Sequence, residues 1–339
     1  MKAISYIGIN LVAIGVGLLA AIAAGNAVRG REPAFAAERP LRVRIELSNH
    51  PDTTGALIAG YNYRLLQEFA AEHGLQADIR KAAPDTAALD SLRRGAWDLL
   101  VLPWPQEAAD SLVFTPMPDS CAVWAVTARP KSRHRLVHRF LNALPERWDY
   151  ARTREPFFRI YDPLRVAARG RKLDALGPYD DLIRKYSEGR AWDWRLLAAL
   201  IFQESRFHIE ARSRRGAEGL LQMMPRTARN FGLDNTLDPE ESIRAAADYL
   251  GHLEYIFRGD ADSQEDLQMI VLAAYNAGEG NIKEAIGRAK QYDVPYGTWD
   301  YISNHLDYIA QDTYNGDETR VFVERVYAWY EAFCKIVPE

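Results

Sequence analysis

The chain has 339 residues, of which 48% are hydrophobic and 26% are charged, and its formal net charge is −4. This composition is typical of a globular protein and lacks the basic excess that attracts nucleic acid, so no nucleic-acid partner is expected. The length favours two domains with some sequence left over.

An apolar stretch, Ile4–Ala24, stands near the start of the chain, directly after Lys2 and Ala3. Its 21 residues exceed the core of a typical signal peptide and match the ~20 residues that span a bilayer. We therefore assign residues 1–37 to a signal peptide or a membrane anchor. Small residues offer cleavage sites after Ala27 and Ala36, so removal and retention both stay open. Either outcome places the protein in the periplasm or the cell envelope.

The two cysteines, Cys121 and Cys334, fall in different predicted domains, so the sequence indicates neither a disulfide framework nor a cysteine-based metal site. We interpret both as buried or unpaired thiols. None of the seven histidines shows a metal-binding spacing such as H-E-x-x-H. The sequence predicts no metal and no other cofactor.

Strand and helix patterns alternate after the linker "RGREPAFAAERP". The predicted strands lie at residues 41–47, 76–80, 97–103 and 121–128, and the predicted helices lie at 60–75, 85–95 and 134–144. Such alternation predicts a small α/β layer with a largely parallel sheet.

These segments resemble one lobe of the periplasmic solute-binding proteins of the polar amino-acid type. Those proteins have two lobes and bind their ligand in the cleft between them. Residues 41–162 suffice for only one lobe, so the resemblance implies a truncated, single-lobe α/β domain. With half a cleft, tight capture of an amino acid is not expected. The domain is either a sensor or peptide-docking module, or a spacer that holds the second domain off the membrane.

Strand signals vanish at about Pro178, and helical periodicity continues to the end of the chain, so residues 178–339 form a second domain. Asp193 is placed to cap a helix that starts at Trp194. Four apolar residues follow at helical spacing: Leu196, Leu197, Leu200 and Ile201. Glu204 continues the same stripe.

A carboxyl pressed against an apolar face loses hydration, which raises its pKa toward the range where it donates a proton near neutrality. Glu204 is therefore a candidate acid. The alternative, from this helix alone, is a helix-end glutamate paired with His208 or Arg206.

Three further stretches carry polar residues at predicted turns. "SRRGAEGLLQMMPRTA" predicts a tight turn at two glycines, a short extended piece carrying Gln222, and a helix that starts near Pro225. "LAAYNAGEGNI" ends a hydrophobic helix just before glycines, and "DETRVFVERVYAWY" places Glu318 ahead of an amphipathic helix. At that position an acidic residue also stabilises the helix dipole, without any further function.

In this order and spacing, the four stretches closely resemble the lytic transglycosylase domain of the soluble (SLT) type. The marks of that family are E-S, G-L-M-Q-x-M-P, A-Y-N-A-G and E-T-x-x-Y-V, and the match covers residues 178–333. With the α/β domain ahead of it, the whole chain resembles the membrane-bound lytic murein transglycosylases, shortened in the first domain. Leu221 and Phe322 depart from the family pattern, which has Met and Tyr there, and the second removes a hydroxyl from the expected groove.

The resemblance implies a mainly α, lysozyme-like domain that cleaves the β-1,4 bond between N-acetylmuramic acid and N-acetylglucosamine and forms a 1,6-anhydro product. It makes Glu204 the catalytic acid. Seven further residues are implied to form or support the substrate site: Ser205, Ser213, Gln222, Met224, Tyr275, Asn276 and Glu318. For Ser205, which helps to hold the local structure, and for Met224, simple packing is an equal alternative to contact with substrate. The implied partners are peptidoglycan glycan strands, stem peptides at the first domain, and the membrane at the N-terminal segment.

A glycosidase that uses water usually needs two carboxylates, whereas this sequence marks one strongly. A single acid suffices if the sugar supplies its own nucleophile. The alternatives are a lysozyme-like muramidase, in which Glu318 or Asp234 activates water, and a non-catalytic peptidoglycan-binding envelope sensor.

Overall fold

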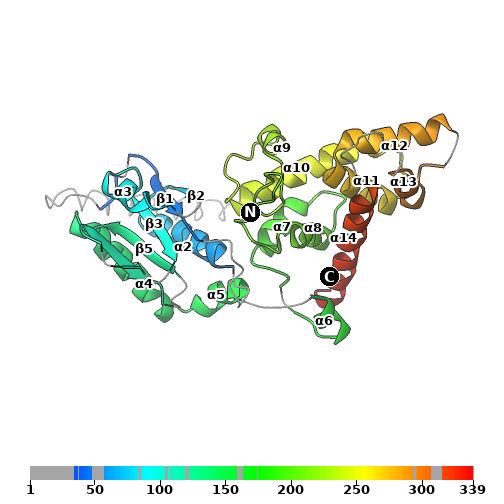
Figure 1. The fold of residues 1–339 in the computed structure, drawn as a ribbon. Coiled ribbons are helices and arrows are strands. Elements are labelled where there is room, and N and C mark those ends of the chain that lie inside the picture. Colours follow the sequence, from blue (N-terminus) through cyan, green and yellow to red (C-terminus); the bar gives the residue numbers. More distant parts are fainter. Residues whose placement is uncertain are drawn as a thin grey trace, which may run out of the picture. The chain divides into compact units, whose positions relative to one another are not determined.

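The computed structural model describes residues 34–36, 38–47, 57–82, 85–103, 106–107, 109–118, 122–158, 163–173, 175–292, 295–306 and 315–338. The predicted signal or anchor at Ile4–Ala24, and Cys121, lie outside these residues. No helix of the described part is long and apolar enough to cross a bilayer. The chain divides near Phe158 into two compact units, each of which has its own core (Figure 1).

The first unit is built on a five-stranded sheet. Its strands are β1 (Leu41–Ile45), β2 (Ala77–Lys81), β3 (Leu99–Pro103), β4 (Leu112–Pro116) and β5 (Ala122–Thr127). Its helices are α2 (Ile58–Glu72), α3 (Ala88–Arg93), α4 (Lys131–Ala143) and α5 (Tyr150–Phe158), with a 3-10 turn at Leu144–Glu146. The strand order is β2-β1-β3-β5-β4.

Helices cover both faces of this sheet. Successive residues of a strand point to opposite faces, so one strand can pack against helices on both sides. Trp124 on β5 packs against Phe69 of α2 and Phe140 of α4, and its indole nitrogen donates to the Asn62 side chain at 2.8 Å. Its neighbours on β5 point the other way, into a cluster that includes Leu92 of α3. The unit is therefore a three-layer α/β/α sandwich.

The sheet is mixed rather than largely parallel, which corrects the sequence prediction. β1 pairs in parallel with β2 and β3, but β5 runs antiparallel to both of its neighbours, β3 and β4. The prediction also missed β4 (LVFTP), a short edge strand without regular alternation. Because β4 and β5 form an antiparallel pair with no helix between them, the strand–helix alternation ends at β3.

The second unit is helical over the described residues, apart from two isolated bridges in the loop after α8, so the predicted change of class is confirmed. Its helices are α6 (Pro163–Ala168), α7 (Asp180–Ser187), α8 (Trp194–Ser205), α9 (Pro225–Asn230), α10 (Pro239–Phe257), α11 (Gln264–Ala277), α12 (Glu279–Gln291), α13 (Trp299–His305) and α14 (Gly316–Ile336). α6 precedes the predicted boundary at residue 178, yet it packs against α14.

Local signals fix several helix ends as predicted. The Asp193 carboxylate accepts a hydrogen bond from the Arg195 backbone N–H at 2.8 Å and caps α8, which begins at Trp194. Pro225 occupies the first turn of α9, where its missing N–H costs nothing.

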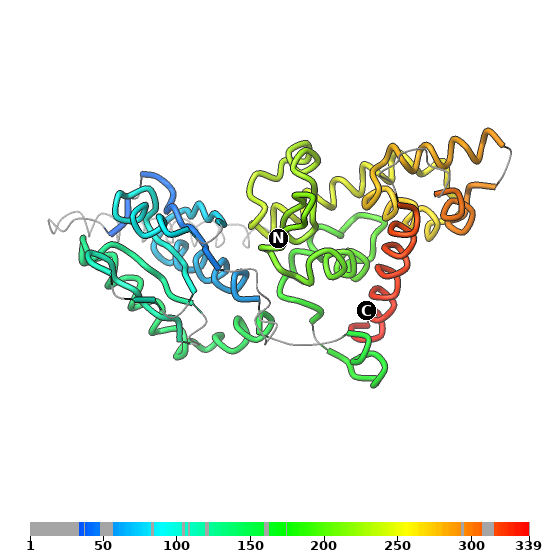
Figure 2. The backbone as a smooth tube through the Cα atoms, viewed as in Figure 1, coloured from blue at the N-terminus to red at the C-terminus, as the bar shows by residue number. Residues whose placement is uncertain are grey.

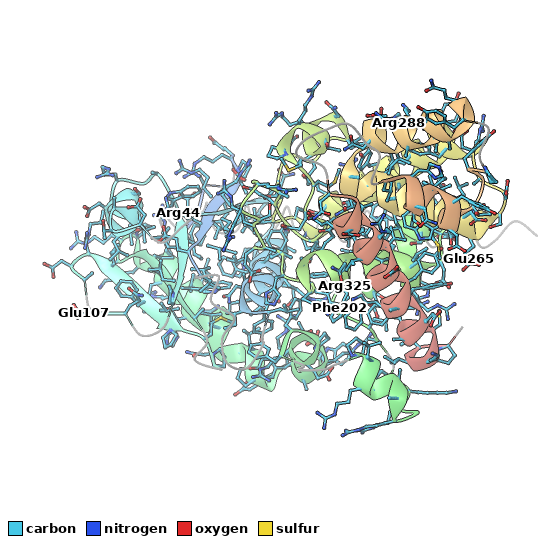
Figure 3. The ribbon with its side chains drawn as sticks, turned by 45° about the vertical axis from the view of Figure 1, so that its right-hand side comes forward. Arg44, Glu107, Phe202, Glu265, Arg288 and Arg325 are labelled. Carbon is cyan, nitrogen blue, oxygen red and sulfur yellow. The ribbon has the colours of Figure 1, made fainter. Side chains whose placement is uncertain are left out.

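The long helix α14, red in Figure 2, packs against α8. Tyr330, late in α14, donates to Asp193 at the start of α8, whereas Trp329 and Phe333 contact Phe202 near the end of α8. Phe202 is labelled in Figure 3 beside α14. α14 thereby supports the turn of α8 that carries Glu204.

Candidate active site

Glu204 lies in the last turn of α8, one residue before the helix ends. The apolar residues of its stripe, Leu196, Leu197, Leu200 and Ile201, are all buried. Burial raises the pKa of Glu204 to about 8, because the surrounding protein removes the water that would solvate the charged form. The residue nevertheless keeps part of its surface exposed. Glu204 therefore carries a carboxyl group that is largely protonated at neutral pH.

The alternative of a helix-end ion pair does not hold among the described residues. His208 instead contacts Glu210, with Nδ1 at 3.1 Å from Oε1. The Arg206 guanidinium lies over the rings of Phe202 and Trp329, at 4.1 and 4.6 Å from their centroids. Burial is the sole cause of the raised pKa of Glu204, so no described carboxylate or cation acts strongly on it.

The backbone around Glu204 is strained. Four non-glycine residues of the described part have left-handed φ angles, and three of them lie here: Arg206 (53°), Phe207 (66°) and Gln222 (46°). Each such residue costs roughly 1–2 kcal/mol, and the conformation persists only where its surroundings enforce it. The stacked Arg206 and the buried ring of Phe207 supply that support. The strain is thus concentrated directly after Glu204 and at Gln222.

Gln222 is held by the loop that joins α8 to α9. Its amide nitrogen donates to the carbonyls of Ala211 (3.0 Å) and Gly219 (2.9 Å). Both donor hydrogens are engaged, which leaves the amide oxygen as an acceptor for a sugar hydroxyl or N–H. The predicted turn is confirmed, since Gly216 and Gly219 have φ angles of 86° and 78°.

Tyr275, near the end of α11, lies close to the acid. Its pKa is raised well above the usual range, first by burial and then by the charge of Glu204. Its hydroxyl donates to the Leu221 carbonyl at 2.6 Å, which ties α11 to the loop that carries Gln222. Among the described contacts, Tyr275 thus positions that loop.

Asn276 is exposed, and its side-chain oxygen accepts a hydrogen bond from the Thr319 hydroxyl at 3.1 Å. Its amide nitrogen remains for other acceptors. The bond also brings the first turn of α14 to the end of α11. Glu318 lies within this first turn rather than ahead of the helix, and its side chain is exposed. Of the two glycines expected to turn the chain here, only Gly278 has a positive φ, because Gly280 lies inside α12.

Three other predicted substrate residues differ in their surroundings. The Ser213 hydroxyl accepts a hydrogen bond from the Ala217 N–H at 3.0 Å and shapes the loop. Met224, which precedes α9, is 46% exposed and offers an apolar surface. Ser205 is buried and donates to the Ile201 carbonyl in its own helix, so its described contacts are structural.

The sequence did not reveal an aromatic row that continues from Tyr275. Tyr249 lies 5.5 Å from Tyr275, Phe231 lies 5.1 Å from Tyr249, and His252 lies 5.8 Å from Phe231, measured between ring centroids. These residues come from α10, α11 and the end of α9, and no motif links them. Thr319 was also missed as a partner of Asn276, although it stands inside the quoted "DET" motif.

The raised pKa of Glu204 predicts that stability depends on pH. Between pH 4.5, the ordinary value, and about 8, the folded state keeps a proton that the unfolded state releases. Stability therefore falls as pH rises through this window, and the loss is complete above about 8. Replacement Glu204→Gln removes this slope. We expect the variant to gain about 2 kcal/mol over the parent at pH 9, after allowance for partial exposure, or roughly 4–8 °C in Tm.

Thermal unfolding at pH 5, 7 and 9 measures this difference, with Glu210→Gln as the matched control from the same segment. A gap between variant and parent that stays constant from pH 5 to 9 would contradict the raised pKa.

Part of the second unit is similar to a known family of protein domains. Residues 181–295 match the family model of the transglycosylase SLT domain. The chain is 32% identical over 216 residues to the membrane-bound lytic murein transglycosylase F of Alcanivorax borkumensis, covering 62% of this chain and 45% of that protein. It is 26% identical over 297 residues to the protein of the same name from Vibrio campbellii, covering 84% and 52%.

Among solved structures, the 70 kDa soluble lytic transglycosylase of Escherichia coli matches with a TM-score of 0.38 and 23% identity, over 61% of this chain and 31% of that one. The chain spans about half the length of the two curated relatives described above.

Proposed function

We propose that this chain, which carries a transglycosylase SLT domain, is a lytic transglycosylase that acts on peptidoglycan. One observation carries the proposal: burial raises the pKa of Glu204 to about 8, and the nearby Tyr275 donates a hydrogen bond to the loop that carries Gln222. An acid that is protonated at neutral pH is what cleavage of a glycosidic bond requires. The names of the relatives support the same activity.

In the proposed reaction, Glu204 donates its proton to the oxygen that links N-acetylmuramic acid to N-acetylglucosamine. The C1–O bond breaks, and positive charge develops at C1. The Glu204 carboxylate then takes the proton of the C6 hydroxyl while O6 bonds to C1. The 1,6-anhydro ring closes, no water is consumed, and the acid returns to its starting state.

We assign positioning to the groups around the acid. The Gln222 side-chain oxygen and the Asn276 amide nitrogen form no hydrogen bond with the described residues, and both suit the hydroxyl and N-acetyl groups of a sugar. Met224 offers an exposed apolar contact for a ring face, and Tyr275 holds the Gln222 loop against α11. Such prepositioned groups lower the barrier because they need not reorganise during the reaction.

A hydrolytic muramidase would place a second carboxylate next to the reacting bond. The sequence motifs and the names of the relatives support the single-acid mechanism over a role for Glu318 or Asp234 in activating water.

The mass of the products tests the proposal. Purified sacculi incubated with the protein should release muropeptides one water lighter than those that a muramidase releases. Release of the heavier, hydrolysed products would favour the muramidase, and no release by the folded protein would favour a non-catalytic binder.

We also propose that the first unit is a truncated solute-binding-like lobe and that the protein resides in the periplasm or cell envelope, anchored or exported by its N-terminal segment. Two observations support the assignment of the first unit: its three-layer α/β/α sandwich, and the similarity to the Vibrio campbellii protein, which covers 84% of this chain. A single lobe leaves half of a ligand's charged groups in water, so we expect no tight amino-acid binding and, at most, contact with stem peptides.

A further inference from the structure

The segment around the predicted sugar site is strongly basic. Residues 211–230 contain five arginines and one acidic residue, a net charge of 5 − 1 = +4 in a chain whose net charge is −4. The arginines are Arg212, Arg214, Arg215, Arg226 and Arg229, and all five are exposed. Repulsion within such a cluster of like charges destabilises the folded state unless other contacts offset it.

Contacts within the fold account for two of the five. Arg212 pairs with Glu218, with Nε at 3.3 Å from Oε1. Arg229 lies in the last turn of α9, where the helix dipole favours a cation.

The other three gain no such support. Arg214 and Arg215 are neighbours at the tip of the loop between Ser213 and Ala217, and neither has an ion-pair or hydrogen-bond partner among the described residues. Arg226 lies in the first turn of α9, which contains no acidic residue, and there the helix dipole disfavours a cation. We call Arg214, Arg215 and Arg226 the arginine rim.

The arginine rim borders residues predicted to bind sugar. Its two loop members follow Ser213, whose hydroxyl holds the same loop closed, and Arg226 comes two residues after the exposed Met224. The ring hydroxyls and N-acetyl groups of the glycan are neutral. Negative charge enters this substrate on one side only, through the lactyl ether of muramic acid. That group ends in its own carboxylate when the strand is bare and leads to peptide carboxylates when the stem is attached.

We propose that the arginine rim binds the carboxylates carried on the lactyl side of muramic acid, and so selects the charged side of the glycan strand. A planar guanidinium matches a carboxylate through two parallel hydrogen bonds. This inference rests on the proposed peptidoglycan substrate but does not depend on whether the reaction is lytic or hydrolytic.

Binding to insoluble sacculi tests the arginine rim apart from turnover. In the full-length Glu204→Gln protein, which holds substrate without cleaving it, we expect native sacculi to bind about tenfold more tightly than sacculi whose carboxylates have been amidated. Added Arg214→Gln and Arg215→Gln replacements should bring this ratio close to one. The matched control, Arg258→Gln with Lys283→Gln, removes two exposed charges elsewhere in the same unit and should keep the ratio.

Soluble glycan strands stripped of their stem peptides, compared with and without amidation of the lactyl carboxylate, distinguish the two sources of charge. If the protein still prefers the non-amidated form, the arginine rim binds the free lactyl carboxylate. If the preference is lost, the arginine rim binds the peptide carboxylates. Raising the salt concentration should weaken the preference of the Glu204→Gln protein, which provides a check without loop substitutions.

Equal binding of native and amidated sacculi by the Glu204→Gln protein would overturn the inference, as would an unchanged ratio in the protein with both loop replacements. The proposed function fails separately, if the parent protein forms no anhydro product while its binding still depends on carboxylates.

Discussion

Replacement of Glu204 by glutamine should reduce the release of anhydro products by at least ~100-fold, the low end of what general acid catalysis contributes. Glutamine keeps the shape and much of the hydrogen-bonding capacity of the side chain but has no acidic proton to transfer. The local fold should survive, because Glu204 forms no ion pair among the described residues and its ionisation is unfavourable there. The loss should therefore appear in kcat, with little change in binding to sacculi.

The matched control is Glu210→Gln, which removes another partly buried carboxylate from the same segment. Glu210 contacts His208 and takes no part in the proposed proton transfer, so the Glu210→Gln protein should retain activity within a factor of about three. A Glu204→Gln protein that works as well as this control would remove Glu204 from the role of catalytic acid.

The features that the sequence predicted correctly depend on residues close together in the chain. The cap at Asp193, the start of α9 at Pro225 and the apolar stripe that ends in Glu204 each need only a few neighbouring positions. Helical periodicity also sufficed to predict the direction of the pKa shift of Glu204, because it placed the carboxyl on a buried face.

The features that it missed depend on pairings between distant segments. The reversed strand β5 and the edge strand β4 are defined by their partners rather than by their own patterns. In the same way, Tyr275 reaches across 54 residues to the Leu221 carbonyl, and Thr319 across 43 to Asn276. A motif identifies which polar residues are candidates for the site. Only the fold shows which atoms of those residues already form hydrogen bonds within the protein.

Gly219→Ala should destabilise the second unit by about 3 kcal/mol and disturb the site. Gly219 has a φ of 78°, which costs an alanine roughly 1–2 kcal/mol. An added Cβ would also lie 2.5 Å from the Thr236 carbonyl oxygen, a backbone atom that cannot move aside alone. Since Gly219 donates to Ala211 and accepts from Gln222, its displacement should shift the Gln222 amide and lower activity about tenfold or more.

Gly216→Ala separates the two causes, because Gly216 lies in the same loop with a φ of 86° but an added Cβ there would meet nothing within 4 Å. It should cost only the backbone strain, about 1 kcal/mol, and leave most activity. Urea unfolding and product release, measured on both variants, give the comparison. If Gly219→Ala loses clearly more stability and more activity than Gly216→Ala, the close approach to Thr236 fixes the position of Gln222. Equal losses would mean that the backbone conformation alone sets the loop and that the approach to Thr236 plays no part in holding the site.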